Sequence, residues 1–132
     1  AAADSRAKPG SRLRVYTTFA TWCPSCLKHL PMQRRLNEEL AGEGVELVAV
    51  PIDEADDNKK LAAYNKEWHP PARLVNLAPA MRKDATAAFA KALGEEPPLP
   101  TTVITDGSGR FLSAQAGVPT VSALRKILAR KP

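Results

Sequence analysis

The apolar positions of the chain follow two different spacings, and together they predict an α/β protein. Short β-branched or apolar runs predict strands at residues 12–20, 45–52, 72–77, 101–105 and 111–118. Between these runs, apolar residues recur every three or four positions, which is typical of amphipathic helices. The helical patterns contain Met32, Leu36 and Leu40; Leu61, Tyr64 and Trp68; residues 80–93; and residues 121–128.

Capping and turn residues mark the ends of these predicted elements. The glycines at 42 and 44 end the first helix, Pro70-Pro71 ends the second, and Gly94 ends the third. The turn at residues 106–109, Asp-Gly-Ser-Gly, predicts a closing hairpin. The order strand, helix, strand in the first part of the chain requires a parallel strand pair with a right-handed crossover, and the hairpin adds antiparallel strands. The predicted fold is therefore a mixed sheet covered by helices.

Composition restricts the class of protein without naming a function. The 132 residues are enough for one domain with its own core. The formal net charge of +5 comes from the two ends, because acidic residues slightly outnumber basic ones between residues 15 and 124. We therefore expect solvated basic ends and no nucleic-acid surface. No apolar run is long enough to span a bilayer.

The sequence predicts a leader or linker at residues 1–11 and one folded domain at residues 12–132. The first ten residues are small, polar or basic, and Pro9-Gly10 closes the segment. They lack the apolar stretch of a signal peptide. The sequence is equally compatible with a mature protein and with an excised domain.

The two cysteines of the chain, Cys23 and Cys26, are separated by two residues. A structural disulfide between them would close a very short loop and would constrain the unfolded chain little. Structural zinc needs four ligands, and the sequence adds only His29 and His69 to the two thiols. Metal binding stays open as an alternative, but redox chemistry fits the pair better.

The position of the pair, between a predicted strand and a predicted helix, favours a thiolate at Cys23. Backbone N–H groups and the helix dipole stabilise an anion at the start of a helix. The thiolate is the attacking species in thiol–disulfide exchange. We expect Cys23 to be exposed at the start of the helix, and Cys26, one turn inside it, to be less exposed and to have the resolving role.

From residue 12 to the C-terminus the sequence resembles the thioredoxin-like superfamily. Residues 22–26, Trp-Cys-Pro-Ser-Cys, resemble its Trp-Cys-X-X-Cys motif, and Pro31 matches the proline that kinks its active-site helix. Leu99-Pro100 resembles the segment with the cis-proline that faces the cysteines. Residues 101–109 and the Cys-Pro-Ser-Cys core are similar to the TlpA-like branch with its cytochrome c maturation reductases. The resemblance implies a mixed β-sheet flanked by helices on both faces, with an inserted helical element before the cis-proline.

The resemblance also implies which residues serve the redox site. Cys23 and Cys26 are the expected catalytic pair. The expected supporting or substrate-binding residues are Trp22, Pro24, Ser25, His29, Leu99 and Pro100. We interpret Trp22 as a shield beside the site and the acidic run at residues 53–57 as a solvated helix cap. No metal and no cofactor are expected.

Three positions depart from the family pattern. Thr17 stands where thioredoxins have a buried Asp, and His29 stands where many TlpA-like reductases have a Glu. Pro24-Ser25 replaces the usual Gly-Pro dipeptide. A buried acid in these proteins is thought to accept the proton of the resolving thiol, so the acceptor for Cys26 stays open. His29 fits a proton-handling role and a structural hydrogen bond to the backbone equally well.

These observations predict a thiol–disulfide oxidoreductase that reduces extracytoplasmic bacterial proteins. Its expected partners are disulfide or dithiol proteins and an upstream thiol protein that donates electrons. We expect a monomer, with a membrane tether outside this chain as one option and a cytoplasmic location as another. The alternative is a copper chaperone-like module that binds Cu(I) through Cys23, Cys26 and His29. A peroxidase is less favoured. Peroxiredoxin-like sites have a proline and a threonine shortly before the reactive cysteine, and no proline occurs from Ser11 to Trp22.

Overall fold

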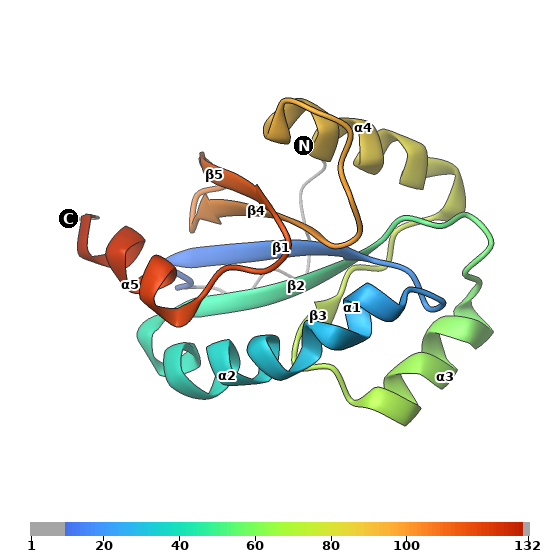
Figure 1. The fold of residues 1–132 in the computed structure, drawn as a ribbon, viewed down its shortest axis with the longest axis horizontal. Helices are drawn as coiled ribbons and strands as arrows, with labels where there is room; N and C mark the ends of the chain where they lie inside the picture. Colours follow the sequence, from blue (N-terminus) through green and yellow to red (C-terminus); the bar gives the residue numbers. More distant parts are fainter. Residues whose placement is uncertain (1–9, 131–132) are drawn as a thin grey trace.

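A five-stranded mixed sheet forms the centre of the molecule in the computed structural model, which describes residues 10–130 (Figure 1). The strand order is β3-β2-β1-β4-β5, in which β1 pairs in parallel with β2 and β2 with β3. Antiparallel pairs join β1 to β4 and β4 to β5. The strands are β1 (Leu13–Phe19), β2 (Val45–Pro51), β3 (Arg73–Leu74), β4 (Thr101–Asp106) and β5 (Phe111–Ala116). The predicted strands and hairpin are confirmed.

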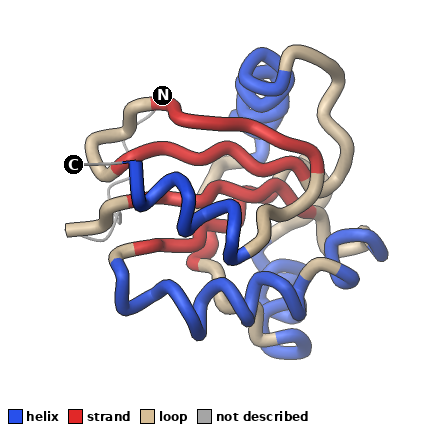
Figure 2. Tube along the Cα trace, turned by 60° about the vertical axis from the view of Figure 1, so that its left-hand side comes forward, coloured by secondary structure: helices blue, strands red, loops and turns tan. Residues whose placement is uncertain are grey.

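Helices cover both faces of this sheet. They are α1 (Pro24–Lys28), α2 (Leu30–Leu40), α3 (Asn58–Trp68), α4 (Arg82–Leu93) and α5 (Val121–Arg130), with 3₁₀ turns η1 (Ala41–Glu43) and η2 (Pro79–Met81). Right-handed crossovers from β1 to β2 and from β2 to β3 place α2 and α3 on one face, where α5 joins them. Figure 2 shows α2 and α5 in front of the strands, with α4 behind β4 and β5. The predicted thioredoxin-like arrangement is therefore present.

The main core lies between the sheet and the helices α2 and α5. Leu13 and Val15 project from β1 towards Leu36 of α2 and Leu124 of α5, and all four side chains are buried. Alternation along β1 explains this choice, because residues two apart share one face of a sheet. The same alternation continues through Thr17 to the end of the strand, where the two cysteines follow.

One helical prediction is confirmed and another needs correction. The helix that follows the cysteines is divided at His29, because Pro31 has no N–H to donate to the carbonyl of Leu27. This break is the kink that the resemblance implies for Pro31. Trp68 was expected on the buried stripe of α3, but it is 36% exposed, because α3 ends there and His69 takes a left-handed conformation.

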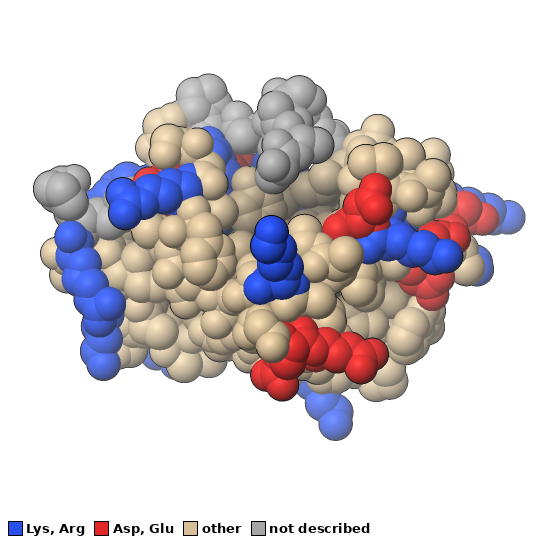
Figure 3. Space-filling view, turned by 90° about the horizontal axis from the view of Figure 1, so that it is seen from above, with Lys and Arg blue, Asp and Glu red and all other residues tan. Residues whose placement is uncertain are grey.

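The charged residues on the face shown in Figure 3 carry both signs, and on the right of the view acidic and basic side chains lie side by side. This distribution agrees with a charge excess located at the chain ends rather than in one basic patch. Residues 1–9, which make up most of the predicted leader, lie outside the described residues. Within residues 10–130, no helix has the length and hydropathy needed to cross a bilayer.

Candidate active site

The cysteine loop begins where β1 ends, at the carboxyl edge of the central strand (Figure 1). Cys23 is the N-cap of α1, and Pro24 occupies the first turn, where a proline needs no hydrogen-bond partner for its nitrogen. The backbone N–H of Cys26 donates to the sulfur of Cys23 at 3.1 Å. A hydrogen bond to a sulfur favours its ionised form. The local structure therefore distinguishes the two sulfurs, because the sulfur of Cys23 accepts a hydrogen bond from the backbone of the other cysteine.

Both cysteines are buried, so the expected exposure of Cys23 is wrong. Cys23 is 3% exposed and Cys26 is 4% exposed, and both are free thiols. They belong to a second apolar cluster with Phe19, Ala20, Leu61 and Tyr64, which α3 helps to close. The sequence showed that Cys23 starts a helix, but the covering residues come from a helix more than thirty positions later.

Burial has a large effect on the resolving thiol. It raises the pKa of Cys26 to about 12, and the hydrogen bond and charge of Cys23 act in the same direction. A thiol with this pKa is almost entirely protonated at neutral pH. Cys26 therefore needs a group that assists the loss of its proton before it can attack a disulfide.

The segment around Leu99 and Pro100 reaches the cysteines, as the resemblance implies. The Leu99–Pro100 peptide bond is cis. Pro100 lines a small cavity together with Cys26, and Leu99 packs against the cluster that contains both cysteines. Two parts of the chain more than seventy positions apart thus meet at the redox pair.

Both ring nitrogens of His29 lie beside backbone groups. Its Nδ1 lies 2.7 Å from the carbonyl oxygen of Ser25, one turn earlier. Because a carbonyl only accepts, Nδ1 carries the proton and Nε2 is left as an acceptor. Nε2 lies beside Gly117, 3.5 Å from the position that a Cβ on this glycine would occupy. The structural interpretation of His29 gains support, since its ring is held by the backbone.

A chain of hydroxyl groups occupies the position of the missing buried acid. Thr102 donates from its hydroxyl to the carbonyl of Gly117 at 2.6 Å, which uses its only proton. The 3.1 Å contact between the hydroxyls of Thr17 and Thr102 therefore has Thr17 as its donor. Thr17 is buried at the site, but its proton is committed to Thr102. It cannot donate to a thiolate at Cys26.

The acidic run at residues 53–57 is only partly a solvated cap. Asp57 caps α3 by accepting from the N–H of Lys60, as expected. Asp56 is 1% exposed, and its carboxylate accepts from both the N–H and the hydroxyl of Thr21, at 2.8 and 2.5 Å. Asp53 accepts from the indole N–H of Trp22. Two of the acids thus hold the residues that precede Cys23.

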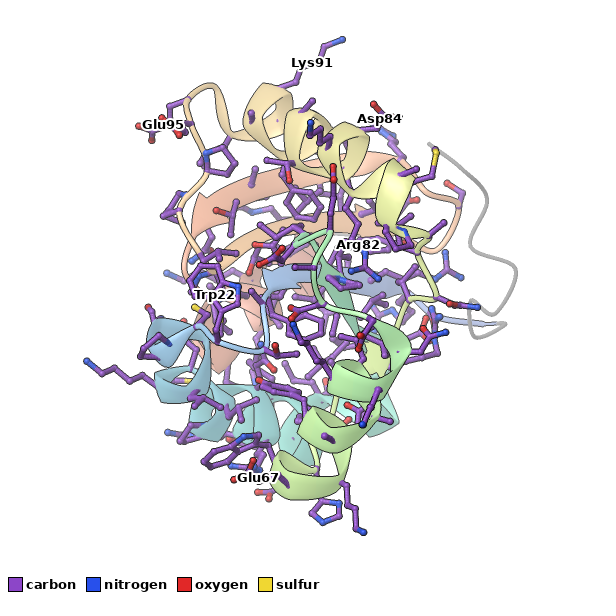
Figure 4. All side chains as sticks on the ribbon, turned by 90° about the vertical axis from the view of Figure 1, so that its right-hand side faces the viewer. Trp22, Glu67, Arg82, Asp84, Lys91 and Glu95 are labelled. Carbon is purple, nitrogen blue, oxygen red and sulfur yellow. The ribbon has the colours of Figure 1, made fainter. Side chains whose placement is uncertain are left out.

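Arg82 extends this network into the interior. It is 2% exposed, and its guanidinium donates to the backbone carbonyls of Asp53, Asp56 and Leu77. Figure 4 shows Arg82 enclosed near the start of α4, whereas Trp22 stands at the surface. Trp22 is 62% exposed, so it contributes an apolar surface beside the site rather than a cover over it. Sequence reasoning missed Asp56 and Arg82, because their partners are distant backbone groups without a sequence signal.

The three proposed copper ligands are not brought together. Among residues 10–130, no group of three His, Cys, Asp or Glu side chains is arranged to hold a metal ion. The reason is local: Nδ1 of His29 is engaged by the Ser25 carbonyl, and its other nitrogen faces Gly117. Cys23 and Cys26 remain as a pair suited to form a disulfide with each other.

Comparisons with known structures identify the same fold. A thiol:disulfide interchange protein of the thioredoxin family from Chlorobium tepidum TLS is 20% identical, with a TM-score of 0.67 over 91% of this chain and 79% of that chain. The thioredoxin domain of a thiol-disulfide oxidoreductase from Bacteroides vulgatus is 13% identical, with a TM-score of 0.74 over 89% and 80%. StoA from Bacillus subtilis is 19% identical, with a TM-score of 0.61 over 89% and 84%.

The family model described as the AhpC/TSA family matches residues 6–111. That range includes β1 to β4, the cysteine loop and the cis-proline, and so contains every element that builds the site. The chain belongs to the AhpC/TSA family, and it has a thioredoxin-like fold with the pair Cys23 and Cys26 at its site.

Proposed function

We propose that this protein reduces disulfide bonds in extracytoplasmic proteins, with Cys23 as the attacking thiolate and Cys26 as the resolving thiol. The observation that carries the proposal is the asymmetry of the pair. Cys23 accepts a backbone hydrogen bond, whereas burial raises the pKa of Cys26 to about 12. One sulfur is therefore prepared to attack, and the other stays protonated until a mixed disulfide has formed.

The reaction begins when the Cys23 thiolate attacks one sulfur of a substrate disulfide. The substrate disulfide breaks, a Cys23–substrate bond forms, and the other substrate sulfur leaves as a thiolate. Cys26 then loses its proton and attacks the sulfur of Cys23, which releases the second substrate thiolate and leaves a Cys23–Cys26 disulfide. Two electrons pass from the protein to the substrate. An upstream dithiol protein restores the reduced pair by the reverse sequence.

The surroundings of the pair offer a surface for the substrate. Trp22 supplies an exposed apolar side chain beside Cys23, and Pro24 is exposed at the start of α1. Leu99 and Pro100 reach the same pair from a distant part of the chain. We propose that an extended substrate segment lies between these two walls, with the backbone of Leu99 available to it.

The reducing direction rests on the dipeptide between the cysteines. A strongly oxidising protein needs an unusually stabilised thiolate in its reduced form. Here Ser25 offers no charge to the thiolate, and its carbonyl is engaged by His29. An extracytoplasmic location with cytochrome c maturation as the process, a monomeric state and a tether outside this chain are parts of the same proposal.

A turnover assay with single cysteine variants tests the function. With a disulfide-bonded protein such as insulin and excess dithiothreitol, the wild type should accelerate reduction, whereas Cys23→Ser should be inactive. Cys26→Ser should accumulate a covalent mixed disulfide at Cys23. A Cys23→Ser protein that traps substrate through Cys26 would reverse the assigned roles, and an inactive wild type would refute the function.

A further inference from the structure

Beside the resolving sulfur lies a small cavity that the two-cysteine mechanism does not use. Its volume is about 20 Å³, and Cys26, Pro100, Thr17 and Tyr64 are among the residues that line it. About 10–15 Å³ is enough for one water molecule. The cavity can therefore hold a single water next to the thiol that must lose a proton.

The polar groups around this cavity differ in whether they can still donate a hydrogen bond to Cys26. Thr17 has committed its proton to Thr102, and Thr18 donates to the carbonyl of Thr101. Gln33 and Asn65 contribute amides, and no carboxylate is among the lining residues. Proton transfer at Cys26 must therefore rely on water and on neutral groups.

Tyr64 is the hydroxyl that remains available. Its side chain is 7% exposed, and its ring packs on Phe19 with the centroids 5.3 Å apart. Within residues 10–130, no hydrogen bond joins its hydroxyl to another protein group, and no fully enclosed side-chain nitrogen or oxygen lacks a partner. The hydroxyl therefore borders space that water can enter.

The electrostatics of Tyr64 connect it with the cysteines. The pKa of Tyr64 is raised to about 12, mainly by burial and partly by the negative charges of Cys26 and Cys23, while Arg34 of α2 acts in the opposite direction. These are the titratable groups that act on this hydroxyl. Because the phenol stays protonated at neutral pH, it can donate a hydrogen bond whenever a thiolate forms at Cys26.

We propose that Tyr64 is a positioning residue for the resolving step: its hydroxyl holds one water beside Cys26 and, with that water, stabilises the Cys26 thiolate. This inference rests on the proposed function, and it assigns the role of the missing acid to the cavity rather than to His29. The Cys26 proton passes to the cavity water and then to solvent. The thiolate attacks the Cys23 sulfur, the Cys23–substrate bond breaks, and the substrate thiolate leaves and takes a proton from solvent.

A single-turnover reaction with an aromatic disulfide whose thiolate product is coloured separates the two steps. The first release of colour reports attack by Cys23, and the second reports resolution by Cys26. Tyr64→Phe should slow the second release about ten- to hundredfold, which corresponds to the loss of a hydrogen bond to a charged group. The first release should change by less than about twofold, because Cys23 keeps its backbone donor.

Two variants serve as matched controls. Tyr16→Phe removes the other tyrosine hydroxyl of the chain, which does not line the cavity, and it should leave both releases unchanged. His29→Ala tests the rival assignment, and it should slow the second release less than Tyr64→Phe does, since the His29 ring nitrogens lie beside Ser25 and Gly117. An unchanged second release in Tyr64→Phe, or slowing by His29→Ala alone, would overturn the role of Tyr64. Absence of a second release in the wild type would instead refute the proposed function.

A second modification keeps the test valid if Tyr64→Phe disturbs packing. In the Tyr16→Phe background, fluorotyrosine incorporated throughout the protein labels Tyr64 alone. Fluorination makes the phenol more acidic and a stronger donor with almost no change in shape. The pH profile of the second release should then move to lower pH. An unmoved profile would contradict the proposal, because a purely structural ring would not respond to its own acidity.

Discussion

The backbone N–H of Cys26 lies 3.1 Å from the sulfur of Cys23 and donates a hydrogen bond to it. The two cysteines therefore have different roles in this contact. Cys23 receives the hydrogen bond, and Cys26 is held behind it in an apolar cluster. Exposure does not distinguish the two sulfurs, since both are buried. The direction of this hydrogen bond distinguishes them, and it gives the first prediction.

Brief treatment of the reduced protein with iodoacetamide below neutral pH should alkylate Cys23 before Cys26. The reason is that only a thiolate reacts, and burial together with the hydrogen bond and charge of Cys23 raises the pKa of Cys26 to about 12. Both rates should be slower than for an exposed thiol, because access is limited at both positions. Mass mapping of the modified peptide measures the order. Preferential labelling of Cys26 would contradict the assigned roles.

Removal of the Asp56 carboxylate should loosen the segment that leads into Cys23. Asp56→Ala leaves the buried N–H of Thr21 without a partner, which should lower the free energy of unfolding by about 1–3 kcal/mol. It should also accelerate alkylation of Cys23.

Asp57→Ala is the matched control. It removes the N-cap of α3, which should cost about 1 kcal/mol. The alkylation rate should stay the same, because Asp57 is exposed and makes no contact with the cysteine loop. Equal effects of the two variants on the alkylation rate would show that Asp56 acts only through general stability.

Arg82 should be one of the most sensitive positions for stability. Arg82→Met leaves one buried and two partly buried carbonyls without their donor, and the free energy of unfolding should fall by about 3 kcal/mol or more. Lys83→Met removes the neighbouring charge, whose ion pair with Glu54 is long at 3.9 Å and exposed. That variant should change stability by less than about 0.5 kcal/mol. Chemical denaturation measures both, and similar losses would remove the special role of Arg82.

The raised pKa of Cys26 makes the stability of the reduced protein depend on pH. In the unfolded chain this thiol ionises near pH 9, but in the folded protein it keeps its proton until about pH 12. Between these values the unfolded state binds fewer protons, so the free energy of unfolding should fall as pH rises from 9 to 12. Below pH 9 the contribution is fully present.

The control for this prediction is Cys26→Ser, which lacks the buried thiol. Tyr64 contributes a fall of the same sign between about pH 10 and 12, and this fall should be smaller in Cys26→Ser, because the charge of Cys26 is one of the causes that raise the Tyr64 pKa. The wild type should therefore lose more stability than Cys26→Ser over this range. Parallel pH curves for the two proteins would show that the thiol ionises alike in the folded and unfolded states.

Local patterns were sufficient to predict most of the fold. The alternation in residues 13–19 and the spacing of Leu36 and Leu40 give the same core face that the structure shows. The glycine at 94 ends α4 in a left-handed conformation, as its position after the helix predicted. These features depend on residues that are close together in the sequence, so they could be predicted from it.

The site was predictable only where a motif identified it. Cys23, Cys26 and Pro100 were found by resemblance, and the structure brings them together. Asp56 and Arg82 were missed because their partners are backbone groups of other segments. The burial of Cys23 was missed for a related reason, since the covering side chains come from α3. Tertiary contacts of this kind have no local pattern.

The most direct test of the central claim is equilibration of the protein with mixtures of reduced and oxidised glutathione. We expect one two-electron transition in which Cys23 and Cys26 form an intramolecular disulfide. The midpoint should lie nearer the thioredoxin value of about −270 mV than the value of about −120 mV for a strong oxidant. Failure to form that disulfide, or a midpoint near −120 mV, would contradict a reductant that works through this pair.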